Sequence, residues 1–208
     1  MATNFPTSVD NFTNPTANDS LNLPSHSTQH ANANDAIEAV ESYLLTEPFG
    51  MRLVKKQTIG SAVTSVTVTN AFSATYENYL IRIAGGVASA QTDLDIQIGN
   101  ATSAYNYTSI YTRFDTGTVE GLRANSTTEF RYSGGANTTN LQMDCNIDTP
   151  FLTRPTILTA RHIVASANGL TMQTWGYLAN NNSYTDIKIF PATGTLTGGT
   201  IYVYGYTI

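Results

Sequence analysis

Four carboxylates are the first candidates for chemistry: Glu120, Glu129, Asp144 and Asp148. Glycosidases use two such groups, one as a general acid and one as a nucleophile or base. Nothing in the spacing of these four supports a pair of that kind, and acidic residues at alternate strand positions usually form a solvated face. We therefore predict no catalytic residue among them. The enzymatic alternative, a depolymerase that degrades the host envelope, has no motif behind it.

Nucleophiles and thiol ligands are equally sparse. Cys145 is the single cysteine, which excludes a disulfide framework and a thiolate cluster for zinc, and we expect it to be a small buried hydrophobic residue. His162 lies beside Arg161 in a predicted strand, with no serine or cysteine nucleophile motif near it. The sequence contains no GxSxG, Walker or GxGxxG motif. We predict that the protein is not an enzyme.

Two groups of residues resemble metal ligands. His26 and His30 are four residues apart, and threefold repetition of such a pair around an axis can hold an ion. We favour hydrogen bonding to backbone or to a partner surface instead. Asp93, Asp95 and Gln97 resemble a calcium loop, but they alternate with apolar residues on a predicted strand, which places them on its water-facing side. We predict no metal site and no cofactor.

Aromatic residues are the most informative side chains in the β-rich part of the sequence. They form three groups, and those of the last group alternate along one strand and so share one face. Such a face suits packing against a neighbouring subunit or stacking on the sugar rings of a glycan, and we favour subunit packing. The candidate residues are Tyr105, Tyr107, Tyr111, Trp175, Tyr177, Tyr202, Tyr204 and Tyr206.

A helix is predicted over residues 25–46. Ala33, Ile37, Val40 and Leu44 recur at intervals of four, three and four, which places them on one side of a helix as an apolar seam. The spacing resembles the a and d positions of a coiled coil. A helix of about 15–20 residues is marginal alone in water, so we expect a partner, either the same helix of sister subunits or a groove on another protein.

Residues 1–24 are predicted to form an extended arm. Pro6, Pro15 and Pro24 interrupt any helix or central strand, and most other residues are small and polar. The arm carries isolated apolar residues that we expect to press into a receiving surface as anchors. They include Phe5, Phe12, Leu21 and Leu23.

The predicted β domain covers residues 51–208. Pro48 and Gly50 end the helix, and beyond them the apolar period changes from about 3.6 to 2. About ten short segments rich in β-branched and aromatic residues are separated by turn residues, with no helix for a parallel crossover. The fold class is therefore mainly β, an antiparallel β-sandwich, jelly-roll-like, preceded by the arm and one α-helix.

Composition limits the partners. Charged residues make up 12% of the 208 residues, and the net charge is −5, which disfavours nucleic acid and anionic membranes. No apolar run reaches the roughly 20 residues that a membrane-spanning helix needs, and we expect no membrane insertion. The first residues do not resemble a signal peptide, so we expect synthesis in a cytoplasm.

The first 45 residues closely resemble the N-terminal segment of structural proteins of tailed bacteriophages, among them tail, fibre and appendage proteins. The residues that carry the likeness are Phe5-Pro6-Thr7-Ser8, Ser25-His26, Gln29-His30-Ala31-Asn32 and Asn34-Asp35-Ala36-Ile37-Glu38-Ala39. The resemblance implies attachment to a virion, with synthesis in the host bacterium. The β domain, with its Gly-Thr-Ile-Tyr-Val-Tyr-Gly ending, is similar in style to terminal domains of phage fibres and decoration proteins.

Together these observations predict a non-enzymatic virion structural protein that forms a homo-oligomer, a trimer by preference, and binds other virion proteins. We favour a capsid decoration, or cement, protein. The alternative is a short tail or head fibre, an adhesin that binds a receptor or glycan on the host surface.

Overall fold

A computed structural model describes residues 8, 16, 18, 20, 22, 25–46, 50–166 and 168–206, and only the backbone of residues 45 and 46. The chain forms two compact units, Met1–Phe49 and Gly50–Ile208, each of which is described by itself. The predicted arm, with its proposed anchors Phe5, Phe12, Leu21 and Leu23, lies almost wholly outside the described residues.

The first unit contains helix α1 (His26–Thr46). Ser25 occupies the position before its first helical residue, and its carbonyl oxygen accepts the N–H of Gln29 at 3.0 Å, which begins the helical ladder. The Ser25 hydroxyl bonds to the hydroxyl of Ser27 at 3.0 Å. Within the described part of the chain no helix is both long and apolar enough to cross a membrane.

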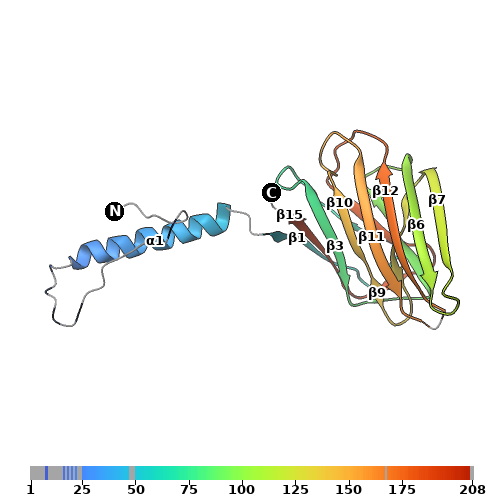
Figure 1. Ribbon diagram of the computed structural model, residues 1–208, viewed down its shortest axis with the longest axis horizontal. Helices are drawn as coiled ribbons and strands as arrows, with labels where there is room; N and C mark the ends of the chain where they lie inside the picture. The colour runs from blue at the N-terminus through green and yellow to red at the C-terminus, as the bar shows by residue number, and fades with distance from the viewer. Residues whose placement is uncertain are drawn as a thin grey trace. The chain divides into compact units, whose positions relative to one another are not determined.

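The second unit is built from two antiparallel sheets, with the larger one facing the viewer in Figure 1. Its strand order is β1 (Met51–Thr58), β15 (Thr200–Tyr206), β3 (Asn78–Ala84), β10 (Asp144–Asp148), β11 (Thr156–Val164), β12 (Leu170–Leu178), β6 (Tyr105–Arg113) and β7 (Val119–Thr127). The smaller sheet has the order β2 (Val66–Val68), β13 (Ile187–Pro191), β5 (Thr92–Ile98), β8 (Phe130–Ala136) and β9 (Leu141–Gln142). The two-residue strands β4 (Val87–Ala88) and β14 (Leu196–Thr197) form a separate ladder.

The predicted fold class, an antiparallel β-sandwich preceded by one helix, is therefore confirmed. The described residues contain fifteen strands, more than the roughly ten expected, because two-residue strands are too short to show a periodic pattern. Strands β1 and β15 pair along their whole lengths, and β15 also pairs with β3. This pairing ties the beginning of the β unit to its end.

Alternation along the strands separates the core from the outer face of the larger sheet. In β11 every second residue is buried and the residues between them are exposed, as the period of a half-buried strand requires. The buried set of β11 is Thr156, Leu158, Ala160, His162 and Val164. Cys145 of β10 is also fully buried, which confirms its predicted place in the core.

A glycine in β12 allows a close contact between the two sheets. A Cβ atom at Gly176 would lie 2.8 Å from Cε1 of Phe130 in the smaller sheet and 2.8 Å from the carbonyl oxygen of Asn106. The Phe130 ring packs edge-on against Tyr105, with ring centroids 4.7 Å apart. Any larger residue at position 176 would push this aromatic pair away from the sheet.

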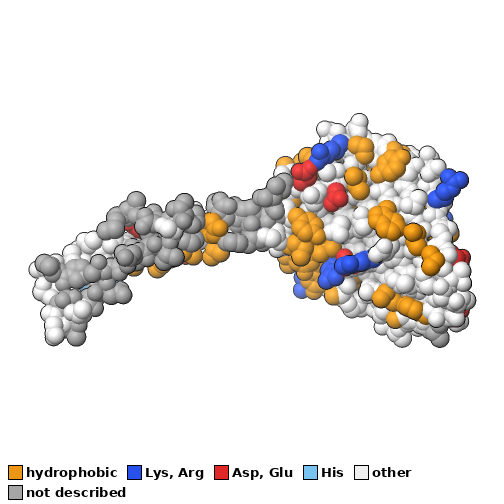
Figure 2. All heavy atoms as spheres, viewed as in Figure 1, with side chains coloured by type: hydrophobic (Ala, Val, Ile, Leu, Met, Phe, Trp, Pro, Cys, Tyr) orange, Lys and Arg blue, Asp and Glu red, His pale blue; other side chains and the backbone are white. Residues whose placement is uncertain are grey.

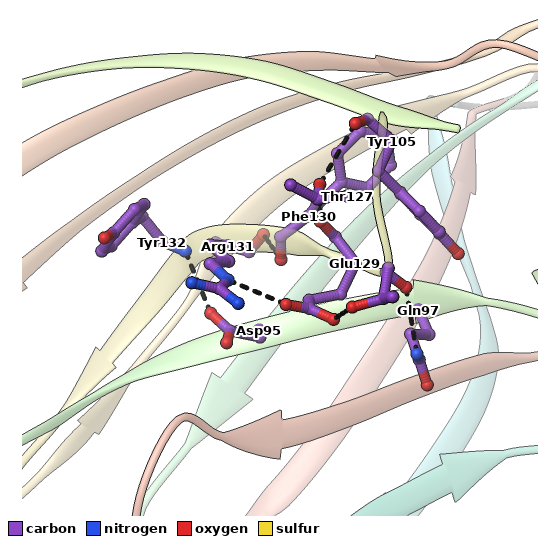
Figure 3. A network of polar contacts seen from close by, with 10 residues as sticks. Asp95, Gln97, Tyr105, Thr127, Glu129, Phe130, Arg131 and Tyr132 are labelled. Atoms are coloured by element: carbon purple, nitrogen blue, oxygen red, sulfur yellow. Dashed lines mark hydrogen bonds and ion pairs between the residues drawn. The ribbon is translucent and has the colours of Figure 1, made fainter. Parts of the chain in front are cut away.

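Two carboxylates, Asp95 and Glu129, are buried near this aromatic pair, and Figure 3 shows their polar contacts. Asp95 of β5 is only 4% exposed, and its Oδ1 accepts the backbone N–H of Tyr132 at 3.1 Å. Glu129 accepts Nε–H of Arg131 at 2.8 Å and the hydroxyl of Thr128. The sequence-based expectation that Asp95 faces water is therefore wrong, because the pairing of β5 with β8 shifts register between Leu94 and Ile96, and the Asp95 carboxylate bonds to the backbone of β8 there.

Burial shifts the pKa of two of these groups in opposite directions. It raises the pKa of Asp95 to about 7. The hydrogen bond from the backbone of Tyr132 lowers this pKa, but by less than burial raises it. Burial lowers the pKa of His162 to about 4, because the buried ring is disfavoured as a cation. Neither ring nitrogen of His162 has a hydrogen-bond partner among the described residues, and the Asp93 carboxylate lies 4.0 Å from Nε2.

These shifts predict opposing effects on stability between pH 4 and 7. Between about pH 4 and 7 the folded state holds a proton on Asp95 that the unfolded chain releases. The contribution of Asp95 to the free energy of unfolding therefore falls as pH rises through this range. The folded state excludes a proton from His162, so its contribution rises from about pH 4 to 6.5. In Asp95→Asn the free energy of unfolding, relative to the unsubstituted protein, should rise with pH by up to about 1.4 kcal/mol per pH unit. In His162→Phe it should fall over the same window.

Urea unfolding of the three proteins at half-unit pH steps measures both slopes. Parallel curves for all three would contradict the burial of these charges.

Candidate binding surfaces

The outer face of the eight-stranded sheet exposes several large apolar side chains. Figure 2, which looks onto this sheet, shows them as separate hydrophobic areas divided by uncharged polar surface and a few charged groups. Cross-strand pairing fixes their positions, because directly opposed residues lie on the same side of a sheet. The exposed residues of β6, β11 and β12 include Ile110, Ile157, Ile163, Trp175 and Tyr177.

One carboxylate and two arginines form an ion-pair ladder across three neighbouring strands of this face. Asp144 of β10 lies opposite Arg82 of β3 and opposite Arg161 of β11. Its Oδ2 accepts a hydrogen bond from Arg82 Nη2 at 2.8 Å and two from Arg161, at 3.1 Å from Nε and 3.0 Å from Nη2. Partial burial raises the pKa of Asp144, but the hydrogen bonds and charges of the two guanidinium groups outweigh it and hold the pKa below its usual range.

A groove of about 530 Å³ lies beside this ladder on the same face. Trp175 and Tyr177 of β12 are 41% and 49% exposed and contribute its aromatic surface. Ile157 comes from β11, while Asn106 and Asn125 come from β6 and β7. No charged side chain is among the described residues that line the groove. Its chemistry therefore suits an uncharged ligand that has both apolar faces and hydrogen-bonding groups.

The three tyrosines of β15 share one face of the sheet, as their alternation predicted. The rings of Tyr202 and Tyr204 stack, with centroids 6.3 Å apart and planes inclined by 17°. The Lys56 ammonium group lies 5.8 Å from the centroid of Tyr202, and the Tyr206 hydroxyl donates to Asn146 Oδ1 at 2.8 Å. All three tyrosines are half-buried, so part of each ring remains accessible to solvent. We call Tyr202, Tyr204 and Tyr206 together the β15 ledge.

The prediction that Tyr105 and Tyr107 lie on an interface or a glycan-binding surface is wrong. Tyr105 is fully buried and Tyr107 is 6% exposed. The Tyr105 hydroxyl accepts the N–H of Ile98 at 2.8 Å and donates to the carbonyl oxygen of Ala101, so both rings belong to the core rather than to an interface or a glycan site. Tyr111, farther along β6, donates its hydroxyl to Glu120.

Average hydropathy misassigns the faces of β6, because the strand buries Tyr105 and Tyr107 and exposes Ile110. Ser109, which is also buried, bonds to Thr174 of β12 at 2.8 Å and gives the inward face a polar partner there. Only the alternation of Tyr105, Tyr107 and Ser109 signals this orientation. Burying tyrosine and serine while exposing isoleucine contradicts their average preferences.

The apolar seam of α1 is exposed along its length. Ile37, Val40 and Leu44 are 56%, 40% and 55% exposed, and Ala33 is exposed as well. At the beginning of the helix, Nε2 of His26 and Nε2 of His30 lie 3.1 Å apart. The structure therefore presents a continuous stripe of side chains to solvent from the first turn of α1 to its last.

The candidate catalytic carboxylates are dispersed. Glu120 bonds to Tyr111 at one edge of the larger sheet, Glu129 to Arg131 in the smaller one, and Asp144 belongs to the ladder. Asp148 lies farther along β10, and burial raises its pKa. Within the described ranges no three His, Cys, Asp or Glu side chains come together as a metal-ion site.

The sequence matches no protein-family model and no curated protein. A chain in a solved structure described as "Structure of infectious bursal disease virus Gx strain" shares 8% sequence identity and a TM-score of 0.14 with this one. The match covers 77% of this chain and 42% of the other, so this chain spans less than half the length of that one. A similarity at this TM-score carries no argument about function.

The ladder predicts that Asp144 and Asp148 contribute with opposite signs, although both lie on the outer face of β10. Asp144→Asn removes the carboxylate from between two guanidinium groups, and we expect a loss of about 1 kcal/mol in the free energy of unfolding at pH 7. This loss should diminish as pH falls below about 4, the usual pKa of an aspartate, and vanish only below the lowered pKa of Asp144 in the folded protein.

The matched control is Asp148→Asn, which should be neutral or stabilising at pH 7 because burial disfavours the charge that it removes. Chemical unfolding at pH 3 and pH 7 measures both variants. Equal losses from the two would contradict the ladder.

Proposed function

We propose that this protein is a non-enzymatic structural protein of a bacteriophage virion, which self-associates through α1 and displays its β-sandwich as a binding module. The observation that carries the proposal is the exposed seam. Three large aliphatic side chains on one side of a single helix are each at least 40% exposed. An apolar stripe of this kind is typical of an interaction surface.

The spacing of the seam favours a second copy of the same helix as its partner. Intervals of four and three residues are those of a and d positions, which pack as knobs into holes of neighbouring helices. A single helix of 21 residues gains little stability alone. A closed symmetric assembly buries every seam at once, and we propose a trimer.

Two features of the sequence support attachment to a virion. The first 45 residues resemble the N-terminal segment of tailed-phage structural proteins. The arm over residues 1–24 combines three prolines with separate apolar anchors, which suits an extended segment threaded over a protein shell. We therefore favour a capsid decoration protein, with other virion proteins as its partners.

Two aspartates in the seam should abolish self-association. Ile37→Asp with Val40→Asp places charges where apolar side chains of neighbouring copies would meet. Light scattering of the full chain should give the mass of three copies for the unsubstituted protein and of one copy for the variant. The matched control, Ala31→Asp with Asn34→Asp, adds the same charge at exposed positions outside the seam and should remain trimeric. A seam variant that keeps the trimer would refute this interface.

The place on the virion where the protein is attached can be located on intact particles. An antibody against the β unit, coupled to gold and viewed by electron microscopy, should label the head if the protein decorates the capsid. Label confined to the tail tip would contradict decoration and favour a receptor-binding appendage.

The groove at Trp175 and Tyr177 favours a second candidate function, glycan binding by a short fibre. Two neighbouring exposed rings offer flat apolar surfaces to sugar rings, and the amide of Asn125 at the groove can bond to hydroxyl groups. The uncharged lining disfavours nucleic acid and acidic peptides.

If the groove binds glycan, Trp175→Ala should weaken binding of the full chain to polysaccharide from the host surface by about tenfold, the effect of about 1.4 kcal/mol. Tyr177→Ala should act in the same direction. Tyr204→Ala, which removes a ring from the distant β15 ledge, is the control and should bind normally. Equal binding by the Trp175 and Tyr204 variants in a surface plasmon resonance titration would exclude the groove.

A further inference from the structure

His26 and His30 are placed as a pair of ligands for one metal ion. Their Nε2 atoms lie 3.1 Å apart on successive turns of α1, and the two rings are nearly perpendicular, with centroids 4.4 Å apart. Both side chains are exposed, so an ion from solution can reach them.

The separation of the two nitrogens matches that of neighbouring ligands on a transition-metal ion. Imidazole nitrogens bind such ions at about 2.0–2.1 Å, so two neighbouring ligands lie about 2.8–3.0 Å apart at the octahedral angle and up to about 3.4 Å apart at the tetrahedral angle. The observed 3.1 Å falls within this range. A small rotation of each ring would therefore turn the present hydrogen bond into a bidentate site.

The same two residues continue the seam towards the beginning of α1. At roughly 100° per residue, the pair and the four seam residues lie within an arc of about 80° around the helix. The complete stripe, with intervals of four, three, four, three and four, is His26, His30, Ala33, Ile37, Val40 and Leu44. In an assembly that buries the seam, the histidines of every copy would meet at the axis.

Against the sequence-based prediction of no metal site, we propose that His26 and His30 of three copies bind one divalent transition-metal ion on the axis of the helical trimer. This inference rests on the self-association proposed above. Three pairs supply six imidazole nitrogens, a set that suits nickel, zinc or iron. Without an ion, polar layers in a coiled coil reduce its stability, whereas a bound ion converts them into a cross-link between the copies.

The composition of the chain makes the site easy to isolate. The whole sequence contains three histidines and one cysteine. His162 and Cys145 are both buried in the β unit, so removal of the other two histidines leaves a protein without an accessible imidazole or thiol.

The experiment uses the full chain, freed of metal with a chelator and titrated with Ni²⁺ or Zn²⁺ by calorimetry, with light scattering in parallel. We expect one ion per three chains and tighter association after loading. His26→Gln with His30→Gln should weaken binding at least tenfold and abolish the effect of metal on association.

A second variant is the matched control. It adds Ser27→His and Ala31→His to the double glutamine variant, which moves the same four-residue pair roughly 100° around the helix and out of the seam. This pair should bind one ion per chain and leave association unchanged.

Each failure has a distinct signature. A trimer that binds metal no better than the double glutamine variant would overturn the metal site and leave the proposed trimer in place. One ion per chain in the unsubstituted protein would overturn the shared site. A monomer with and without metal would overturn the self-association itself.

Discussion

The two-residue alternation of the eight-stranded sheet is the constraint on which the β unit depends. One side of each inner strand, from β15 to β6, packs into the core, so the other side is assigned to solvent whatever its chemistry. This is why Ile110 and Trp175 are exposed, while Tyr105 and His162 are buried. The candidate surfaces are thus consequences of strand register, and a slip of one residue in any strand would exchange them with the core.

Register also separates charge from aromatic surface on the outer face. Asp144 faces arginines on both neighbouring strands, and each pair is satisfied within the ladder. Farther along β11 and β12, uncharged residues meet around Trp175 and form the groove. A face that pairs its charges internally can offer an uncharged aromatic groove beside them, which suits a ligand without net charge.

Helix α1 follows a different rule, because its apolar residues have a period near 3.5 and converge on a single stripe. Ile37 and Leu44 remain more than half exposed. The stripe begins with two histidines whose ring nitrogens already approach the separation of metal ligands. Apolar packing and metal binding would therefore both join copies of the protein through the same stripe of α1. The apolar residues would do so by burial, and the histidines by coordination of a shared ion.

Local patterns in the sequence determined the helix, the strand-rich character of the rest, the shared face of Tyr202, Tyr204 and Tyr206, and the burial of Cys145. Each depends on near neighbours in the chain or on strong average preferences. The tertiary structure decided which side of a strand meets the core, and so placed Tyr105 inside and Ile110 outside. It also buried Asp95 and joined Arg82, Asp144 and Arg161. A period of two defines two faces but does not say which is covered, and only pairing between distant strands supplies that information.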